Sequence, residues 1–337
     1  MRLNDEEAEV LKFYVHDLVQ GSIEAFSRRY SFNLVEPVVV ELYPEHDDFA
    51  VRTSGLPGIG LLGVTFGYLV AMDSPSGRAD GDYHWGTTLW HEMAHVFTLE
   101  ATNHLVPRWY SEGISVFEEW STGPLPGRHI PLNVMDAIRE GKLLPTAELD
   151  SGFIRPTYQD QVIVSYMQAG LICQYIEHRW GQDGLISLLQ LFGEGQNTGD
   201  AITNAFGLTP EIFDNGFKEF LDAELATVID GLDSWRDRTQ EAYRAAERDD
   251  WPQALEAAEQ AIALYPEYVA EGNPYALKVR GHEVLGEIEQ ATTTLHAYWR
   301  LGGHDPGALG KLGGLLHESR RSEEAIEVLS DALYVTP

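Results

Sequence analysis

The sequence predicts an α+β domain followed by an all-α module of short helical repeats. Three observations lead to this prediction. A β-branched segment and a glycine-punctuated alternating segment, both before residue 78, predict a small sheet. After residue 100, Gly, Pro and Asn residues separate one helical pattern from the next. Beyond residue 234, a pattern of small residues recurs after 37 and then 34 residues.

Length and composition limit the class of protein. With 337 residues, 44% of them apolar, the chain is long enough for two folded domains with separate cores. The formal net charge of −30 would repel a nucleic-acid backbone and an anionic membrane, so we expect neither as a partner. Adaptation to high salt would explain the same acidity without a functional role. No segment has the roughly twenty apolar residues of a membrane span.

The N-terminus and the cysteine content bear on the cellular compartment. The segment MRLNDEEAEVLKF is acidic where a secretory signal needs basic residues followed by an apolar run. We therefore expect a cytoplasmic protein if the chain is complete, and an exported or periplasmic protein if a signal has been removed. The one cysteine, Cys173, excludes an internal disulfide and a cysteine-based zinc site, and its apolar neighbours favour an inert buried thiol.

The first domain is predicted to span residues 1–230. Apolar residues recur at helical spacing over residues 5–30, and EPVVVELYP (36–44) predicts a strand that ends at Pro44. The alternating part of residues 53–77 predicts one or two more strands. Helices are then expected near residues 110–120, 131–141, 159–180, 183–193, 198–206 and 209–228. The acidic segment VIDGLDS (228–234) is predicted to separate the two domains.

Residues 235–337 are predicted to contain about three repeats. Three positions recur: Ala254, Ala261 and Pro266, then Ala291, Tyr298 and Gly303, then Ala325, Ala332 and Pro337. Twelve residues before the first member of each set stand Ala242, Val279 and Gly313, where paired helices would approach closely. This pattern resembles tetratricopeptide (TPR) repeats, with the last repeat uncapped, and generic Ala-rich hairpins are the alternative. The resemblance implies a solenoid that binds substrate or a protein partner.

The segment LWHEMAHVF (89–97) contains the pattern HExxH in His91, Glu92 and His95. On a helix, residues i and i+4 share a face, so both imidazoles can converge on one metal ion. Glu92 is rotated by about 100° from His91 and can act on a nearby water without being a ligand. A hydrolytic zinc site needs three protein ligands and an open position. The best candidate for the third ligand is Glu112, in PRWYSEGISVFEEW (107–120).

These two segments resemble the gluzincin metallopeptidases. The finer resemblance is to the peptidase-MA-like group, in which LxHExxH is followed by PxWxxEG and TPR-type repeats are commonly appended. It covers about residues 35–225 and implies a zincin-like domain, with a small sheet, an HExxH helix and a helical C-terminal subdomain. By this resemblance, His91, His95 and Glu112 bind Zn²⁺, and Glu92 passes a proton from the attacking water to the leaving amine.

Further residues acquire expected roles. By the same resemblance, Tyr166 donates a hydrogen bond to the developing oxyanion, with Tyr158 as the alternative donor. Glu119 lies seven residues after Glu112, on nearly the same helical face, and could accept a hydrogen bond from a liganding histidine, whereas we expect Glu118 to face solvent. The stretch from Thr65 to Met72 would be the edge strand that pairs with a peptide, or else an ordinary core strand.

The sequence thus predicts a zinc metallopeptidase that cleaves a peptide or protein substrate. One alternative is a catalytically inactive scaffold whose TPR module mediates protein interactions, and another is a structural zinc site with a fourth ligand. Glu92 favours hydrolysis, because neither alternative needs a carboxylate at that position. Endopeptidase and aminopeptidase activity both stay open.

Overall fold

The structure is a computed structural model that describes residues 1–55, 60–79, 81, 83–125 and 127–336. By their contacts, these residues form two units. The first contains Met1–Pro124 and Glu140–Phe220, and the second contains Leu125–Arg139 and Leu221–Thr336. Among the described residues, no helix combines the length and the apolar character that a membrane span needs.

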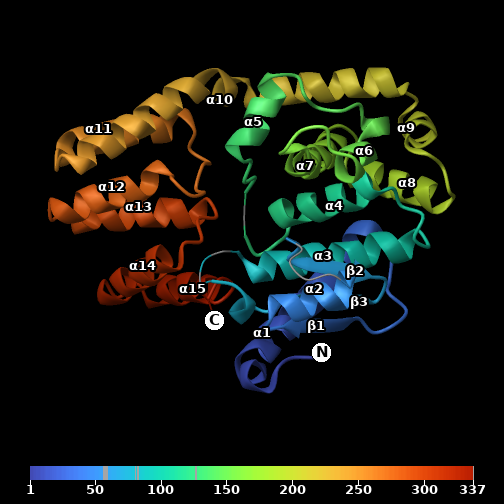
Figure 1. Cartoon of the computed structure of the whole chain (residues 1–337), viewed down its shortest axis with the longest axis horizontal. Helices are drawn as coiled ribbons and strands as arrows, with labels where there is room; N and C mark the ends of the chain where they lie inside the picture. Colours follow the sequence, from blue (N-terminus) through green and yellow to red (C-terminus); the bar gives the residue numbers. More distant parts are fainter. Residues whose placement is uncertain (56–59, 80, 82, 126, 337) are drawn as a thin grey trace. The chain divides into compact units, whose positions relative to one another are not determined.

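The first unit combines a small sheet with many helices (Figure 1). Its strands are β1 (Val39–Tyr43), β2 (Gly63–Phe66) and β3 (Leu69–Asp73). Its helices are α1 (Asp5–Tyr30), α2 (His46–Ser54), α3 (Trp85–Ala101), α4 (Arg108–Ser121), α6 (Asp150–Ile154), α7 (Gln161–Trp180), α8 (Gln182–Gly193), α9 (Thr198–Phe206) and the first part of α10 (Pro210–Glu247), with 3-10 turns at Pro75–Gly77 and Thr146–Glu148. This mostly helical unit with its three-stranded sheet is consistent with the expected zincin-like fold.

The sheet has the strand order β1-β3-β2, with β1 parallel and β2 antiparallel to β3. Within this sheet, β2 pairs with β3 alone, so β2 is an edge strand. The prediction of one or two more strands in this alternating segment is confirmed, with two. The stretch Thr65–Met72 is divided between them, so only its first part belongs to the edge strand. The chain turns at Gly67, whose φ of +58° is a conformation that glycine adopts without a steric penalty. The second half of that stretch lies in the central strand, where Val70, Ala71 and Met72 are almost completely buried.

Helix α4 packs closely against α7 in the centre of this unit. A Cβ atom at Gly113 of α4 would lie 2.7 Å from the carbonyl oxygen of Ala169, and one at Gly170 of α7 would lie 2.6 Å from Cγ1 of Val116. Only glycine allows backbones to approach this closely, so these two glycines set the position of α4. Cys173 lies beside this contact and is buried, as expected. Its burial raises the pKa of the thiol.

The side of α4 that faces α1 buries a charged group. The side chain of Glu118 is completely buried and accepts hydrogen bonds from Arg29 Nε (2.8 Å), Tyr30 Oη (2.5 Å) and Thr122 Oγ1 (2.6 Å). The expectation that Glu118 faces solvent is therefore wrong. The side chain of Glu118 points away from Glu112, as predicted. On that side, however, Arg29 and Tyr30 of α1 contact it and exclude water. A buried carboxylate is tolerated when its oxygens are paired in this way.

The second unit consists of consecutive helices. They are α5 (Leu132–Arg139), the rest of α10, α11 (Trp251–Leu264), α12 (Pro274–Val284), α13 (Ile288–Arg300), α14 (Pro306–Glu318) and α15 (Ser322–Ala332), and Figure 1 shows α11 to α15 stacked in chain order. A Cβ atom at Gly313 would lie 2.6 Å from Cδ2 of Leu329, so α14 and α15 approach closely at one of the predicted small-residue positions. Leu295 and Trp299 of α13 share one apolar core with Leu312 of α14.

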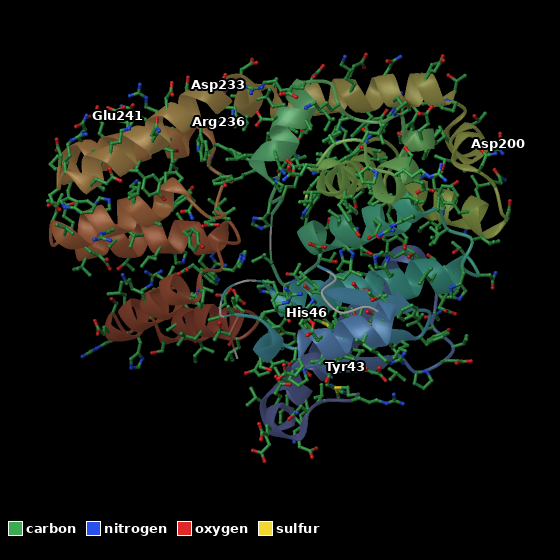
Figure 2. The ribbon with its side chains drawn as sticks, viewed as in Figure 1. Tyr43, His46, Asp200, Asp233, Arg236 and Glu241 are labelled. Atoms are coloured by element: carbon green, nitrogen blue, oxygen red, sulfur yellow. The ribbon has the colours of Figure 1, made fainter. Side chains whose placement is uncertain are left out.

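The acidic segment 228–234 is helical, because α10 runs without a break from Pro210 to Glu247. The prediction that this helix ends near residue 228 is therefore wrong. Within the segment, Leu232 is fully buried, and its packing outweighs the poor helix propensity of the neighbouring Gly and Asp residues. Asp233 and Arg236, labelled in Figure 2, add ion pairs to α5: Asp233 with Arg139 at 3.0 Å, and Arg236 with Asp136 at 2.6 Å.

Candidate active site

Two consecutive helices carry the predicted motifs. α3 begins after His84, whose Nδ1 accepts a hydrogen bond from the backbone of Thr87 at 3.0 Å and caps the helix. α4 begins after Pro107, which follows a short turn in which Asn103 and His104 adopt positive φ angles of 50° and 62°. The turn reverses the chain, so that the HExxH face of α3 meets the beginning of α4.

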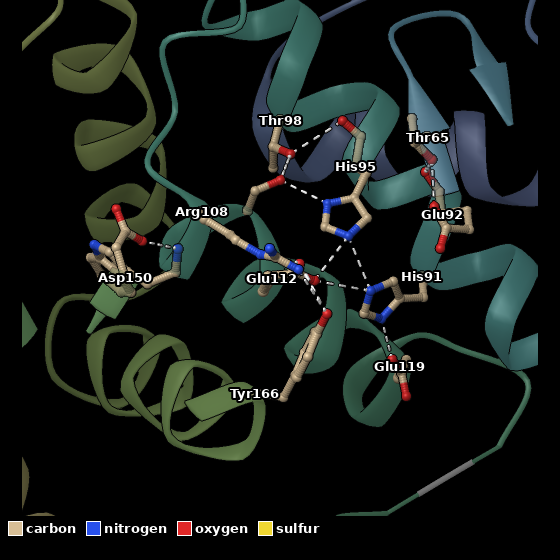
Figure 3. A network of polar contacts seen from close by, with 12 residues as sticks. Thr65, His91, Glu92, His95, Thr98, Arg108, Glu112, Glu119, Asp150 and Tyr166 are labelled. Carbon is tan, nitrogen blue, oxygen red and sulfur yellow. Dashed lines mark hydrogen bonds and ion pairs between the residues drawn. The ribbon is translucent and has the colours of Figure 1, made fainter. Parts of the chain in front are cut away.

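This meeting brings together His91, His95 and Glu112, whose ligand atoms lie within 4.8 Å of one another (Figure 3). The Nε2 atoms of the histidines are 3.1 Å apart, and Oε2 of Glu112 lies 3.1 Å from Nε2 of His95 and 3.4 Å from Nε2 of His91. In a tetrahedral zinc site with bonds of about 2.0–2.1 Å, two ligands are about 3.3 Å apart. The three donor atoms therefore have the chemistry and the spacing of a group that can hold a metal ion.

The other ring nitrogens of both histidines also have partners. Nδ1 of His91 contacts Oε1 of Glu119, so the predicted contact between Glu119 and a histidine of this group is confirmed. Nδ1 of His95 lies 2.7 Å from Oγ of Ser111, which lies 2.7 Å from Oγ1 of Thr98. Hydrogen bonds from Nδ1 orient each ring and leave the Nε2 lone pair for a metal.

The protonation states of these side chains are also consistent with a metal-binding group. Burial alone would lower the pKa of His91, but hydrogen bonds with Glu112 and Glu119 hold it well above its usual range. Burial alone would raise the pKa of Glu112, but the charges and hydrogen bonds of His95 and His91 hold it well below its usual range. Glu112 is thus an ionised carboxylate among cationic or donor groups, and a bound cation would replace the protons that now compensate its charge.

Glu92 lies outside this group and faces the edge strand. Thr65 Oγ1 of β2 donates to Oε2 of Glu92 at 2.6 Å and lies 3.0 Å from its backbone oxygen. A Cβ atom at Gly63 would lie 2.6 Å from Oε1 of Glu92, so the glycine leaves the space that this carboxylate occupies. Sequence reasoning placed Thr65 in a strand near the site but missed its contact with Glu92, because that contact depends on how β2 packs on α3.

Tyr166 reaches the same site from α7. Its hydroxyl donates to Oε1 of Glu112 at 3.2 Å and lies 3.3 Å from Nη2 of Arg108, and Nε of Arg108 donates to the same Oε1 at 3.2 Å. Burial, together with the charge of Glu112, raises the pKa of Tyr166 to about 12, so its hydroxyl stays protonated and able to donate. Of the two predicted tyrosines, Tyr166 lines the cleft described next, and Tyr158 is not among its described lining residues.

A cleft of about 370 Å³ lies over these groups. Its described lining comes from β2 and Leu61 just ahead of that strand, from α3 and α4 with the turn between them, and from Tyr166 of α7. Gly63, Val64 and Thr65 form the edge-strand side, while His91, Glu92 and His95 line the cleft from α3. The cleft therefore joins an open strand edge to the candidate metal group.

A model of the Peptidase MA superfamily matches residues 75–223. The match contains α3, α4 and α7, and with them every residue of the His/His/Glu group. It supports a peptidase-MA-like family for this part of the chain, in agreement with the resemblance of the two motifs, and it favours a peptidase. The chain matches no curated protein and no solved structure.

Proposed function

We propose that the protein is a zinc-dependent metallopeptidase in which His91, His95 and Glu112 hold the ion. The observation that carries the proposal is the spacing of 3.1 to 3.4 Å between their three donor atoms. Two imidazole nitrogens and one carboxylate oxygen are a ligand set typical of catalytic zinc, and this set leaves a position for water or substrate. A zinc ion bound there would polarise a substrate carbonyl and make a water molecule more acidic.

Glu92 would be the general base. Its carboxylate is held by Thr65, beside the metal group but outside it, where it can accept a proton from the attacking water. As the water oxygen bonds to the carbonyl carbon and the carbon–nitrogen bond breaks, Glu92 would deliver the proton to the leaving nitrogen. The products are a carboxylate and an amine. Tyr166, with its protonated hydroxyl in the cleft, would donate a hydrogen bond to the carbonyl oxygen as negative charge develops on it.

The peptide substrate would bind along β2. Within the described sheet this strand pairs on one side only, with β3, and its residues Gly63, Val64 and Thr65 line the cleft. An extended peptide can add to such an edge through backbone hydrogen bonds, which do not require a particular side chain. This arrangement would present a peptide bond of the substrate to Glu92.

We further propose that residues 1–230 form the peptidase domain and that residues 235–337 form a TPR-like module. The sequence period near 34 residues and the close approach of α14 and α15 at Gly313 support the second part. Such a module would bind a protein substrate or partner.

The decisive experiment combines metal analysis with hydrolysis of a peptide library. The purified protein should carry about one zinc per chain, and Glu92→Gln should keep the metal and lose hydrolysis. The double variant His91→Ala/His95→Ala should lose the zinc, whereas His16→Ala, which changes an exposed histidine of α1, should keep both zinc and activity. Zinc at wild-type stoichiometry in the double variant would contradict the proposed site.

A further inference from the structure

One arginine side chain faces the cleft of the proposed peptidase site. Among the described residues that line the cleft, Arg108 carries the only guanidinium or ammonium group, beside the carboxylates of Glu92 and Glu112. The chain as a whole has a formal net charge of −30. Among the described lining residues, Arg108 is the cationic side chain that can attract a substrate carboxylate without belonging to the proposed metal group.

The guanidinium group of Arg108 is supported on one side and accessible on the other. Its central carbon lies 5.3 Å from the ring centroid of Phe153, a buried residue of α6 that packs edge-on against Tyr166. The Arg108 side chain remains 46% exposed, and Nη1 has no hydrogen-bond partner among the described residues. Figure 3 shows the side chain extended over the site toward Glu112 and Tyr166. An N–H fork of the guanidinium is thus available to a ligand in the cleft.

The helix itself does not require an arginine at this position. Arg108 is the first residue of α4, where a positive charge opposes the helix dipole. The carboxylate of Asp150 already accepts a hydrogen bond from the backbone of Trp109, at 2.7 Å, and so caps this end of the helix. Glu112 also has another donor at Oε1, the hydroxyl of Tyr166. A role toward the substrate explains the position of Arg108 better than a role in the helix.

We propose that Arg108 binds a carboxylate of the substrate next to the bond that is cleaved. This inference rests on the proposed peptidase function. A guanidinium group binds a carboxylate through two parallel hydrogen bonds, and support by an aromatic ring holds its plane in place. Nε of Arg108 lies 3.2 Å from a carboxylate oxygen of Glu112. Since Arg108 and the proposed metal group line the same cleft, and an extended chain advances about 3.3–3.6 Å per residue, a carboxylate on Arg108 belongs to a residue close to the reacting bond.

Two groups of a peptide offer this chemistry: a free C-terminal carboxylate and the side chain of Asp or Glu. The test uses acetyl-Ala-Gln-Phe-Gln-Ala as the free acid, as the amide, and as the amide with Glu in place of each Gln in turn. Calorimetric titration into zinc-loaded Glu92→Gln protein measures binding without turnover. At least one carboxylate peptide should bind about tenfold more tightly than the neutral amide. The peptide with this advantage identifies which of the two sources is recognised.

Adding Arg108→Gln to Glu92→Gln should reduce that advantage to less than twofold and leave the affinity for the neutral amide unchanged. The matched control is Arg28→Gln, which removes the same charge from an exposed position on α1 and should preserve the advantage. Equal binding of acid and amide peptides to the Glu92→Gln protein would overturn the proposal. So would an equal loss of affinity for all peptides on Arg108→Gln, or a loss of zinc, since both indicate that Arg108 acts only through Glu112.

The peptidase proposal is tested separately, by turnover of the neutral amide peptide by the wild-type protein. If no peptide is hydrolysed, but a carboxylate peptide binds more tightly than the neutral amide and this difference depends on Arg108, the peptidase proposal fails and the carboxylate site stands. If the neutral amide is hydrolysed at the same rate as its carboxylate counterparts and binds as tightly, the peptidase proposal stands and the carboxylate site fails.

Discussion

The hydroxyl of Thr65 donates a hydrogen bond of 2.6 Å to the carboxylate of Glu92, and this contact joins edge strand β2 to helix α3. The same hydroxyl lies 3.0 Å from the backbone oxygen of Glu92. Thr65 therefore holds the carboxylate of Glu92 close to the backbone of its own helix. In the proposed reaction, the strand that binds the peptide would also orient the general base.

Thr65→Val should lower kcat for peptide hydrolysis by about tenfold, because a misplaced base transfers protons less efficiently. Valine keeps the shape and the β-branching of threonine but has no hydroxyl. Thr65→Ser should stay within about twofold of the wild type, since its hydroxyl can reach the carboxylate. Zinc content should be the same in all three proteins. A kcat for the valine variant equal to that of the wild type would show that Thr65 does not orient Glu92.

Gly63→Ala should reduce hydrolysis more strongly than Gly60→Ala. The added Cβ at residue 63 would lie 2.6 Å from Oε1 of Glu92 and must displace the carboxylate, whereas at residue 60 no described residue other than its chain neighbours lies within 4 Å. Both substitutions add one methyl group to the same segment before or within β2. Steady-state kinetics of the two variants, with circular dichroism as a check on folding, tests the comparison. Equal activities would contradict the close approach of Gly63 and Glu92.

Ser111→Ala should weaken zinc binding by about tenfold, because Nδ1 of His95 loses its partner and the ring loses its orientation. Competition with a chromogenic chelator measures the affinity directly and does not depend on hydrolysis. The matched control is Ser121→Ala at the end of the same helix, where the one hydrogen bond of the hydroxyl within the described part of the chain is to the backbone oxygen of Phe117. If both variants bind zinc equally well, the contact between Ser111 and His95 has no role in metal affinity.

Gly113→Ala should destabilise the first unit by about 1–3 kcal/mol, because its Cβ would lie 2.7 Å from the backbone of Ala169. Gly314→Ala provides the contrast. It adds the same methyl group inside helix α14, where no described atom outside the helix's own backbone lies within 4 Å, so it should stabilise by about 0.5–1 kcal/mol through helix propensity. Urea unfolding followed by tryptophan fluorescence measures both changes. A stabilising effect at Gly113 would contradict the tight packing of α4 on α7.

Asp214→Asn should change how stability depends on pH. Burial raises the pKa of Asp214 in the folded protein, although Thr146 donates to its carboxylate from its backbone and its hydroxyl. As pH rises from the unfolded pKa of about 4 through the raised folded pKa, the unfolded chain loses its proton first, so the wild type loses stability. The asparagine variant has no such titration. The free energy of unfolding of the wild type minus that of the variant should therefore fall as the pH rises above about 4.

The grouping of His91, His95 and Glu112 could be predicted because it depends mainly on local geometry. Two histidines at i and i+4 share a helical face in any helix, and a short turn to the next helix limits where Glu112 can lie. The partner of His95 could not be predicted in this way. Ser111 precedes Glu112 in the chain, but its contact with His95 follows from the rotation of α4 against α3, which no spacing in the sequence specifies.

The wrong predictions have the same origin in tertiary packing. Glu118 was expected in water because its direction on α4 differs from that of Glu112, yet α1 lies on that side and buries it. Helix α10 was expected to end at an acidic, glycine-containing segment, yet burial of Leu232 keeps it helical. Helices α2 and α6 were not predicted, because nine and five residues are too few for a clear helical period.

The pairing of Glu118 with Arg29 and Tyr30 bears on where a fragment of this chain can be cut. The family match begins at residue 75, but the carboxylate buried behind its second helix receives two of its donors from α1. A fragment cut at the boundary of the match would lack α1, and with it two of the three described donors to this carboxylate and the residues that cover it on that side. Recombinant fragments intended for metal or substrate studies should therefore begin before α1.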